Sequence, residues 1–154
     1  MYNNDEVHAL LDEKMIDVIQ LPYNLLDNYS QRGHIIDLAK QKGKIIQSRS
    51  TFLQGLFFSS TDGNHQVVKA LHNELSMIED LSAKYDISIY SMAILYCMAN
   101  QDIDQVLIGV DSLSQLEDLF KIRNTIINED IVDVINQIHV NNKDLLNPSL
   151  WKKQ

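Results

Sequence analysis

The sequence predicts an α/β protein in which about three parallel strands alternate with surrounding helices. Three observations predict this fold class. Short segments rich in β-branched residues lie at residues 16–21, 44–48 and 106–109, and longer segments with helical spacing of apolar residues separate them. We interpret each short segment as a strand buried on both faces, as in a parallel sheet covered by helices. At 154 residues the chain has the size of one domain, so a single domain over residues 1–154 is expected.

The chain is predicted to open with a helix and to continue into the first strand. Asn4 or Asp5 can cap this helix, and its apolar face consists of Val7, Leu10 and Leu11. The spacing then changes to that of a strand over residues 16–21, which Pro22 stops.

A polar loop over residues 24–31 is expected to lead into a second helix and a second strand. The apolar face of that helix is formed by Ile35, Ile36, Leu38 and Ala39. Gly43 suits the position just after the end of a helix, where a left-handed backbone is common. The second strand follows at residues 44–48.

The longest connection predicted in the chain covers residues 49–64 and holds a cluster of apolar side chains between Phe52 and Phe58. Connections of this length without structure of their own are uncommon and often functional. We interpret the cluster as packing beneath the loop. A substrate wall or an interface is the alternative.

Two helices and the third strand follow this connection. Apolar residues recur at helical spacing from Val67 to Leu81, and residues 86–88 break and re-cap the helix. Residues 92–98 are almost all apolar, so this helix must be buried on most sides. The third strand is expected at residues 106–109.

The remaining sequence predicts two further helices and an irregular tail. Leu113, Leu116 and Phe120 form the apolar face of the first. The second has apolar residues at Ile131, Val134, Ile135 and Ile138.

Composition excludes several classes of protein. The 13 basic and 21 acidic residues give a net charge of −8, so nucleic acid is not an expected partner. No apolar stretch reaches the ~20 residues that span a bilayer, so no membrane segment is expected. Cys97 is the single cysteine, which excludes an internal disulfide and favours a cytoplasmic location. We expect it to be a buried structural thiol, and no histidine pair has the spacing of a metal site.

Three blocks of the sequence resemble the aldo-keto reductase family. They are residues 17–24 (DVIQLPYN), residues 48–56 (SRSTFLQGL) and residues 107–112 (LIGVDS), the last followed one helical turn on by QLED. Residues 86–88 and the closing segment 148–151 also look like the C-terminal half of that family. The blocks occur in the family's order and extend over nearly the whole chain.

This resemblance implies an NADP- or NAD-dependent carbonyl reductase built on a (β/α)₈ barrel, of which this chain would form a part. Gln20 would hydrogen-bond the nicotinamide carboxamide, and Arg49 stands where the family often has an aromatic ring that stacks on the nicotinamide. The pyrophosphate would contact Ser50, Phe52 and Gln54. The adenosine end would be surrounded by Gly109, Asp111, Gln115 and Asp118. For Gln115 and Asp118 an ordinary helix surface is the alternative that we favour.

Two departures from the family pattern concern the adenosine end. No Lys or Arg lies between Gly109 and Asp118, where NADP-specific members usually contact the 2′-phosphate. Asp111 would repel that phosphate but could accept a hydrogen bond from a ribose hydroxyl, so NAD is at least as credible as NADP. Leu119 replaces the usual asparagine, which removes an adenine contact.

A larger departure concerns catalysis. The family's catalytic Asp, Tyr, Lys and His lie in the N-terminal half of the barrel, and no stretch here matches them. Residues 1–4 resemble the end of the fifth barrel strand, so the chain is expected to begin mid-barrel. Neither Tyr23 nor Tyr29 has a lysine placed beside it by the sequence. We therefore expect no catalytic residues and a truncated form that is inactive alone.

Four hypotheses remain open at this point. The chain is the C-terminal part of a reductase from a shortened gene, one half of a split reductase, a non-catalytic nucleotide-binding or interaction module, or an unrelated small α/β protein. Three strands cannot close a barrel, so open edges and faces are expected to recruit a partner. We expect a homo-oligomer or a second chain that supplies the N-terminal half.

Overall fold

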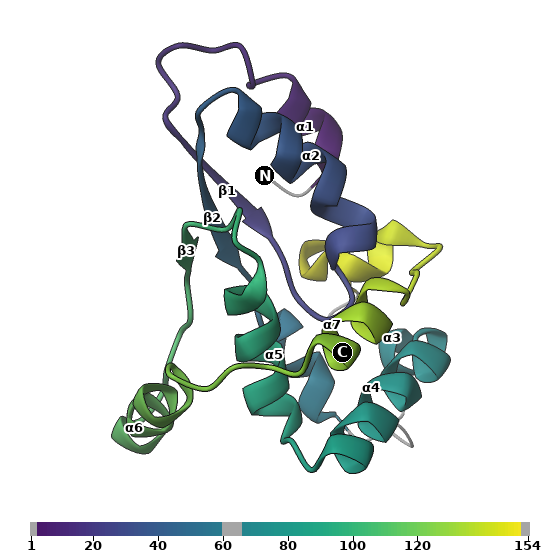
Figure 1. Cartoon of the computed structure of the whole chain (residues 1–154). Helices are drawn as coiled ribbons and strands as arrows, with labels where there is room; N and C mark the ends of the chain where they lie inside the picture. The colour runs from purple at the N-terminus through teal and green to yellow at the C-terminus, as the bar shows by residue number, and fades with distance from the viewer. Residues whose placement is uncertain (1–2, 60–65, 152–154) are drawn as a thin grey trace.

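The computed structural model of the chain describes residues 3–59 and 66–151, and its central feature is a parallel sheet with helices around it (Figure 1). The strands are β1 (Val18–Pro22), β2 (Ile45–Arg49) and β3 (Gln105–Val106). The α-helices are α1 (Asn4–His8), α2 (Tyr29–Gln41), α3 (Gln66–Ala70), α4 (His72–Tyr85), α5 (Ile89–Ala99), α6 (Leu113–Ile122) and α7 (Glu129–Asn136). Three short 3₁₀ helices are η1 (Leu53–Phe58), η2 (Lys143–Leu146) and η3 (Pro148–Leu150).

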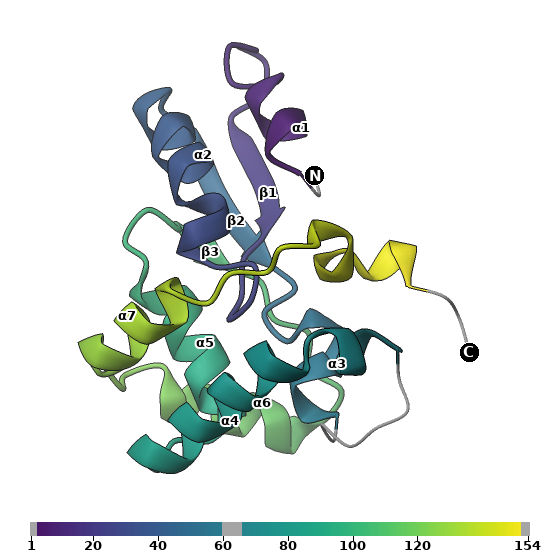
Figure 2. The same cartoon turned by 90° about the vertical axis from the view of Figure 1, so that its right-hand side faces the viewer.

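The sheet has the order β1-β2-β3, and both pairs of neighbouring strands are parallel. Helix α2 connects β1 to β2 and packs against β2, whereas η1, α3, α4 and α5 connect β2 to β3 (Figures 1 and 2). This arrangement confirms the predicted α/β fold with three parallel strands and surrounding helices.

The two faces of the sheet differ in burial. Ile19, Leu21 and Ile46 are fully buried on one face, where they join the hydrophobic core. Val18 and Ile45, which alternate with them, are 43% and 41% exposed. The prediction that the strands are buried on both faces is therefore wrong for the described residues. The helices cover one face, and we call the other the open face.

Local rules predicted most element ends correctly. Gly43 has a φ of 73°, the left-handed conformation expected after α2, and Ser88 caps α5 by accepting a hydrogen bond from the Ser91 backbone N–H. The cap of α1 is Asn3 rather than Asn4 or Asp5. Asn4 is helical, which departs from the strand end expected there, and residues 1–2 and 60–65 lie outside the described part of the chain.

Two segments differ more substantially from prediction. The polar loop expected over residues 24–31 is buried from Asn24 to Asn28, and α2 already begins at Tyr29. The third strand covers only two residues, because β3 pairs with β2 at Gln47 and Ser48 alone.

Helix α5 is buried over residues 92–97, as its composition predicted. Helix α6, in contrast, has no buried residue and stands apart from the sheet in Figure 1. Its expected apolar face is exposed, with Leu113 70% and Phe120 56% accessible. Within residues 3–59 and 66–151, none of the helices has the length and apolar character needed to cross a bilayer.

Asp104 fastens β3 to β2 and yields a pH-dependent prediction. Its Oδ2 accepts a hydrogen bond from the Ile46 N–H at 2.7 Å, and the Lys40 ammonium donates to both of its oxygens at 2.8 Å. These contacts hold the pKa of Asp104 below its ordinary value of 3.8. Such a carboxylate stabilises the fold fully above pH 3.8 and loses this effect as the pH falls through its lowered pKa.

Asp104→Asn is therefore expected to lower the thermal unfolding midpoint at neutral pH and to approach the wild-type midpoint in acid. The measurement is thermal unfolding of both proteins across this pH range, with the exposed Asp80→Asn as the matched control. A midpoint difference that stays constant with pH would contradict the assigned role of the carboxylate.

Candidate functional site

Three glutamine side chains form a row across the open face of the sheet. Gln20, Gln47 and Gln105 are register partners on β1, β2 and β3. Gln20 Nε2 donates to Gln47 Oε1 at 3.3 Å, and Gln47 Nε2 donates to Gln105 Oε1 at 2.6 Å. The row thus orients the amide of Gln20, the residue singled out from the sequence. Sequence reasoning missed Gln47, which lies within the predicted second strand, and Gln105, which directly precedes the predicted third strand.

Arg49 lies at the carboxyl end of β2, two residues beyond Gln47 and so on the same face of the strand. Its Nη1 donates to Ser50 Oγ at 3.0 Å, and its backbone carbonyl accepts from the Tyr23 N–H at 3.1 Å. The structure therefore puts Gln20 and Arg49 on one face, near the carboxyl ends of adjacent strands. Ligands bind at this end of the strands in parallel α/β folds.

The segment after β2 is wound tightly through unusual backbone conformations. Ser50, Leu53 and Gln54 have φ values of 60°, 44° and 53°, in the left-handed region that non-glycine residues seldom adopt. Such residues store strain and are concentrated at functional sites. Phe52 lies between them, half-buried, and its ring stacks on Tyr90 with a centroid distance of 5.0 Å.

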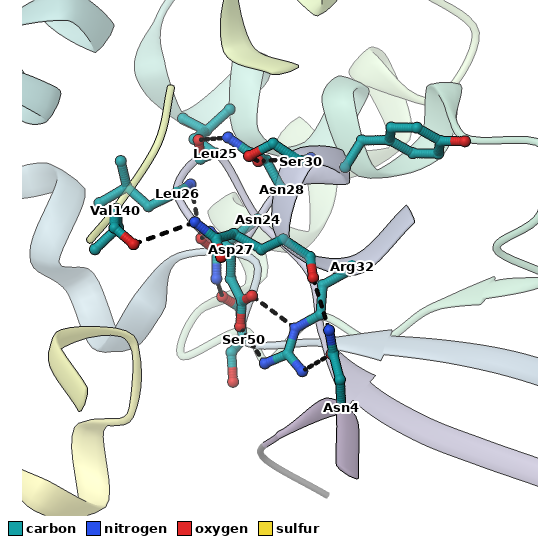
Figure 3. A network of polar contacts seen from close by, with 12 residues as sticks. Asn4, Asn24, Leu25, Leu26, Asp27, Asn28, Ser30, Arg32, Ser50 and Val140 are labelled. Carbon is teal, nitrogen blue, oxygen red and sulfur yellow. Dashed lines mark hydrogen bonds and ion pairs between the residues drawn. The ribbon is translucent and has the colours of Figure 1, made fainter. Parts of the chain in front are cut away.

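Asn24 connects the segment after β1 to the segment after β2. Its Nδ2 donates to the Ser50 carbonyl at 3.1 Å, and its Oδ1 accepts from the N–H groups of Leu26 and Asp27 at 3.0 and 2.9 Å (Figure 3). One buried amide therefore shapes its own turn and fixes the backbone at Ser50. The sequence signal is the set Asn24, Asp27 and Asn28 soon after a strand, a pattern that predicts a polar loop.

A buried ion pair lies beside this turn. Arg32 donates from Nε and Nη2 to the two carboxylate oxygens of Asp27 at 2.6 and 2.7 Å, and from Nη1 to Asn4 Oδ1 at 2.8 Å (Figure 3). The side chains of Arg32 and Asp27 are only 7% and 1% exposed. Burial raises the pKa of Asp27, and the paired guanidinium opposes that shift. The pair holds α2 against the turn that carries Asn24.

The residues expected at the adenosine end have partners of their own on and before α6. Ser112 Oγ accepts from the Gln115 N–H at 3.2 Å, and Gln115 Oε1 accepts from the Asp111 N–H at 2.8 Å. Together these two hydrogen bonds cap the N-terminus of the helix. Asp118 forms an ion pair with Lys121 at 2.7 Å. Gly109 and Asp111 are exposed and precede the helix. These contacts explain the local structure, and they leave the expected cofactor roles as predictions.

The expected cofactor residues fall into two groups. The first lies on β1, at the end of β2 and in the segment that follows β2, and it is formed by Gln20, Arg49, Ser50, Phe52 and Gln54. The second, formed by Gly109, Asp111, Gln115 and Asp118, lies at α6. Tyr90 joins them, because its ring stacks on Phe52 and its hydroxyl donates to the Gln115 carbonyl at 3.4 Å.

Four of the described tyrosines have a raised pKa, which matters for acid catalysis. Burial raises the pKa of Tyr23 to about 12 and raises that of Tyr96 further. Tyr29 and Tyr90 are shifted in the same direction, chiefly by the Asp37 carboxylate and by burial respectively. A proton donor works best when its pKa lies near the working pH, so these environments oppose such a role.

Cys97 is fully buried and its Sγ donates to the Tyr23 carbonyl at 3.2 Å. Burial raises the pKa of this thiol to about 12, so it is held as an unreactive thiol, as predicted. No group of three or more potential metal-binding side chains occurs in the described part of the chain.

Comparison with known proteins identifies the relatives of this chain. The family model "Aldo/keto reductase family" matches residues 3–140. No curated protein matches. Among solved structures, an aldo-keto reductase from Bacillus halodurans is similar in its apo form, with a TM-score of 0.71 and 19% identity. Its holo form gives a TM-score of 0.68 and 18% identity. Both matches cover 90% of this chain and 48% of the other, so the chain spans about half the length of these reductases.

Proposed function

The chain belongs to the aldo/keto reductase family, and from this premise we propose that it binds a nicotinamide dinucleotide along the two groups of residues described above. The nicotinamide carboxamide would be held by Gln20 and the ring would lie on the guanidinium of Arg49. The pyrophosphate would follow Ser50, Phe52 and Gln54, and the adenosine would reach α6. The observation that carries the proposal is that Gln20, in the middle of β1, and Arg49, the last residue of β2, share one face of adjacent strands.

Local geometry supports the assignment of each part. The row of glutamines orients the amide of Gln20, and Asn24 fixes the backbone of Ser50. Consecutive residues in left- and right-handed conformations turn their N–H groups toward a common side, an arrangement that binds anionic groups. The guanidinium of Arg49 is planar and can stack on a ring.

We propose NAD rather than NADP as the preferred nucleotide. Three carboxylates belong to this end of the proposed site, with Asp111 just before α6 and Glu117 and Asp118 in the middle of the helix. Each would repel a 2′-phosphate, whereas the exposed Asp111 can accept a hydrogen bond from a 2′-hydroxyl.

We further propose that the chain does not reduce carbonyl compounds by itself. In the family mechanism a tyrosine assisted by lysine donates the proton. Here Tyr23 contacts Tyr96 and Asn100, and Tyr29 contacts Asp37. Burial raises the pKa of Tyr23 and outweighs the hydrogen bonds to Tyr96 and Asn100, which lower it, and the Asp37 carboxylate raises the pKa of Tyr29. Reduction of a carbonyl would require an acid that another chain or segment supplies.

The open face and α6 favour association with a second copy or with a chain that completes the barrel. Val18 and Ile45 are exposed on the sheet, and Leu113, Leu116 and Phe120 are exposed on α6. An apolar cavity of about 530 Å³ lies between α5 and α6, with Met98, Val106 and Leu116 among its lining residues. Surfaces of this kind are typical of protein interfaces.

The central experiment is a titration of the purified chain with NADH and NADPH, followed by nucleotide fluorescence, with light scattering to record the mass. We expect saturable binding, at least as tight for NADH as for NADPH, a mass above that of one chain, and no carbonyl reduction. If neither NADH nor NADPH binds saturably, the proposed function is overturned.

Replacement of Gln20 provides the residue-level check. Gln20→Ala removes the amide that would bind the carboxamide, and it is expected to weaken NADH binding by about tenfold, the effect of a lost ligand hydrogen bond. Gln41→Ala is the matched control, because Gln41 is also an exposed glutamine and lies at the far end of α2. Equal affinity of both variants would refute the role of Gln20.

A further inference from the structure

Three aromatic rings form a cluster beside the segment that follows β2. Phe52 stacks on Tyr90 with a centroid distance of 5.0 Å and an interplanar angle of 16°. Phe58 packs against both rings, at 5.6 Å from Phe52 and 6.5 Å from Tyr90. We call Phe52, Phe58 and Tyr90 the aromatic platform.

The aromatic platform is more exposed to solvent than the neighbouring residues of η1 that belong to the hydrophobic core. Phe57 and Leu56 in the same 3₁₀ helix are 5% and 3% exposed and fill the core. Phe58, in contrast, keeps 54% of its surface in contact with solvent. Leaving a phenylalanine ring exposed forgoes much of the free energy that its burial would contribute. Packing beneath the loop, the role expected for this cluster, therefore accounts for Phe57 but not for Phe58.

The position of the platform links the two halves of the proposed nucleotide site. Phe52 lies within the segment assigned to the pyrophosphate, two residues after Ser50. Tyr90 begins the path to α6, because its hydroxyl donates to the Gln115 carbonyl at 3.4 Å. A nucleotide that runs from Gln20 past Ser50 toward α6 would pass this platform after its pyrophosphate.

The chemistry of α6 leaves the adenine without an obvious partner there. Gln115 uses its side-chain oxygen to cap the helix at Asp111, and residue 119 is a leucine. The carboxylates of Asp111, just before α6, and of Glu117 and Asp118 within it are unsuited to phosphate, but they do not repel an uncharged base. A flat aromatic surface binds any base through stacking, and each such contact contributes about 1–3 kcal/mol.

We propose that the aromatic platform is the binding surface for the adenine base, which stacks on the exposed ring of Phe58. This inference rests on the proposed function, and it assigns to three side chains the adenine contact that α6 does not supply. Phe52 and Tyr90 hold the surface between the two groups of site residues. Phe58 provides the face that contacts the base.

The test compares ligands that contain adenine with one that lacks it. Wild type, Phe58→Ala and Phe58→Trp are titrated with NADH, ADP-ribose and nicotinamide mononucleotide. Phe58→Ala is expected to weaken NADH and ADP-ribose by about tenfold and to leave the mononucleotide unchanged. Phe58→Trp should keep the affinity, and its indole emission should be quenched by ADP-ribose.

Leu150→Ala is the matched control, because Leu150 is a large apolar residue of similar exposure, 57%, in η3, outside both groups of site residues and the surface proposed for association. It is expected to leave all three affinities unchanged. If wild type binds NADH and Phe58→Ala binds ADP-ribose as tightly as wild type does, the role of the aromatic platform is overturned but the proposed function is not. Wild type that binds none of the three ligands would overturn both.

Discussion

Arg32→Met is expected to lower the free energy of unfolding by about 3–5 kcal/mol, because it leaves the Asp27 carboxylate buried without its partner. The two side chains are 7% and 1% exposed and are joined by two hydrogen bonds of 2.6 and 2.7 Å. The total free energy of unfolding of a small domain is only about 5–15 kcal/mol, so the variant should be close to unfolding. Urea unfolding of both proteins measures the difference.

The exposed pair Asp12–Lys42 is the matched control for this substitution. Its nitrogen–oxygen distance is also 2.6 Å, but its side chains are 85% and 51% exposed. Lys42→Met is therefore expected to leave the free energy of unfolding nearly unchanged. A similarly small effect of Arg32→Met would show that the Asp27–Arg32 pair is not buried in solution.

A second substitution separates the cost of the buried charge from that of the lost packing. Asp27→Asn in the Arg32→Met background removes the uncompensated carboxylate and should restore part of the lost free energy of unfolding. Without Arg32, burial keeps the pKa of Asp27 raised, opposed by the charges of Lys143 and Arg49 but no longer by the guanidinium hydrogen bonds. A raised pKa means that the folded state favours the protonated carboxyl of Asp27. The loss of unfolding free energy caused by Arg32→Met should therefore be smallest in acid.

Tyr96→Phe is expected to cost about 2–4 kcal/mol of the free energy of unfolding, because one buried oxygen serves three partners. Tyr96 Oη accepts from the Tyr23 hydroxyl and from the Tyr29 N–H, both at 3.0 Å, and donates to Asn136 Oδ1 at 2.6 Å. These contacts join α5 to the start of α2, to α7 and to the turn after β1. The phenyl ring of the variant keeps the packing, including the stack with Tyr23 at 5.3 Å.

Tyr29→Phe is the matched control, because its hydroxyl makes an exposed contact of 3.3 Å with Asp37. It is expected to change the free energy of unfolding by less than about 0.5 kcal/mol. Urea unfolding with comparison of both slopes and midpoints measures the two variants. Equal stability of Tyr96→Phe and wild type would contradict the triple role of the hydroxyl.

The sequence identified several residues of the candidate site, but it could not show how they come together in space. The resemblance identified Gln20 and Arg49, and the strand pattern predicted that both lie at strand ends. It could not show that Gln47 and Gln105 complete a row with Gln20, because that row depends on the register of three strands. Nor could it show that Tyr90, far along the chain, stacks on Phe52.

The turn after β1 illustrates the same limit. Asn24, Asp27 and Asn28 flank two leucines directly after the strand, and polar residues of this kind predicted a polar loop. In the structure these residues are buried because distant groups satisfy them. Asn24 reaches the Ser50 carbonyl, and Asn28 reaches the carbonyls of Ile135 and Ile138 at 2.7 and 2.9 Å. Burial of a polar residue is decided by its partners, which the local pattern does not contain.

The sequence by itself determined the local conformations of this protein. β-Branched runs bounded by Pro22 and Gly43 specify β1 and the start of β2, and Ser88 specifies the start of α5, because these preferences arise from backbone sterics and from hydrogen bonds a few residues away. Only the tertiary structure decided which surfaces are covered. The open face and the exposed side of α6 contain residues of ordinary core type, since burial depends on what packs against a residue and not on its own preference.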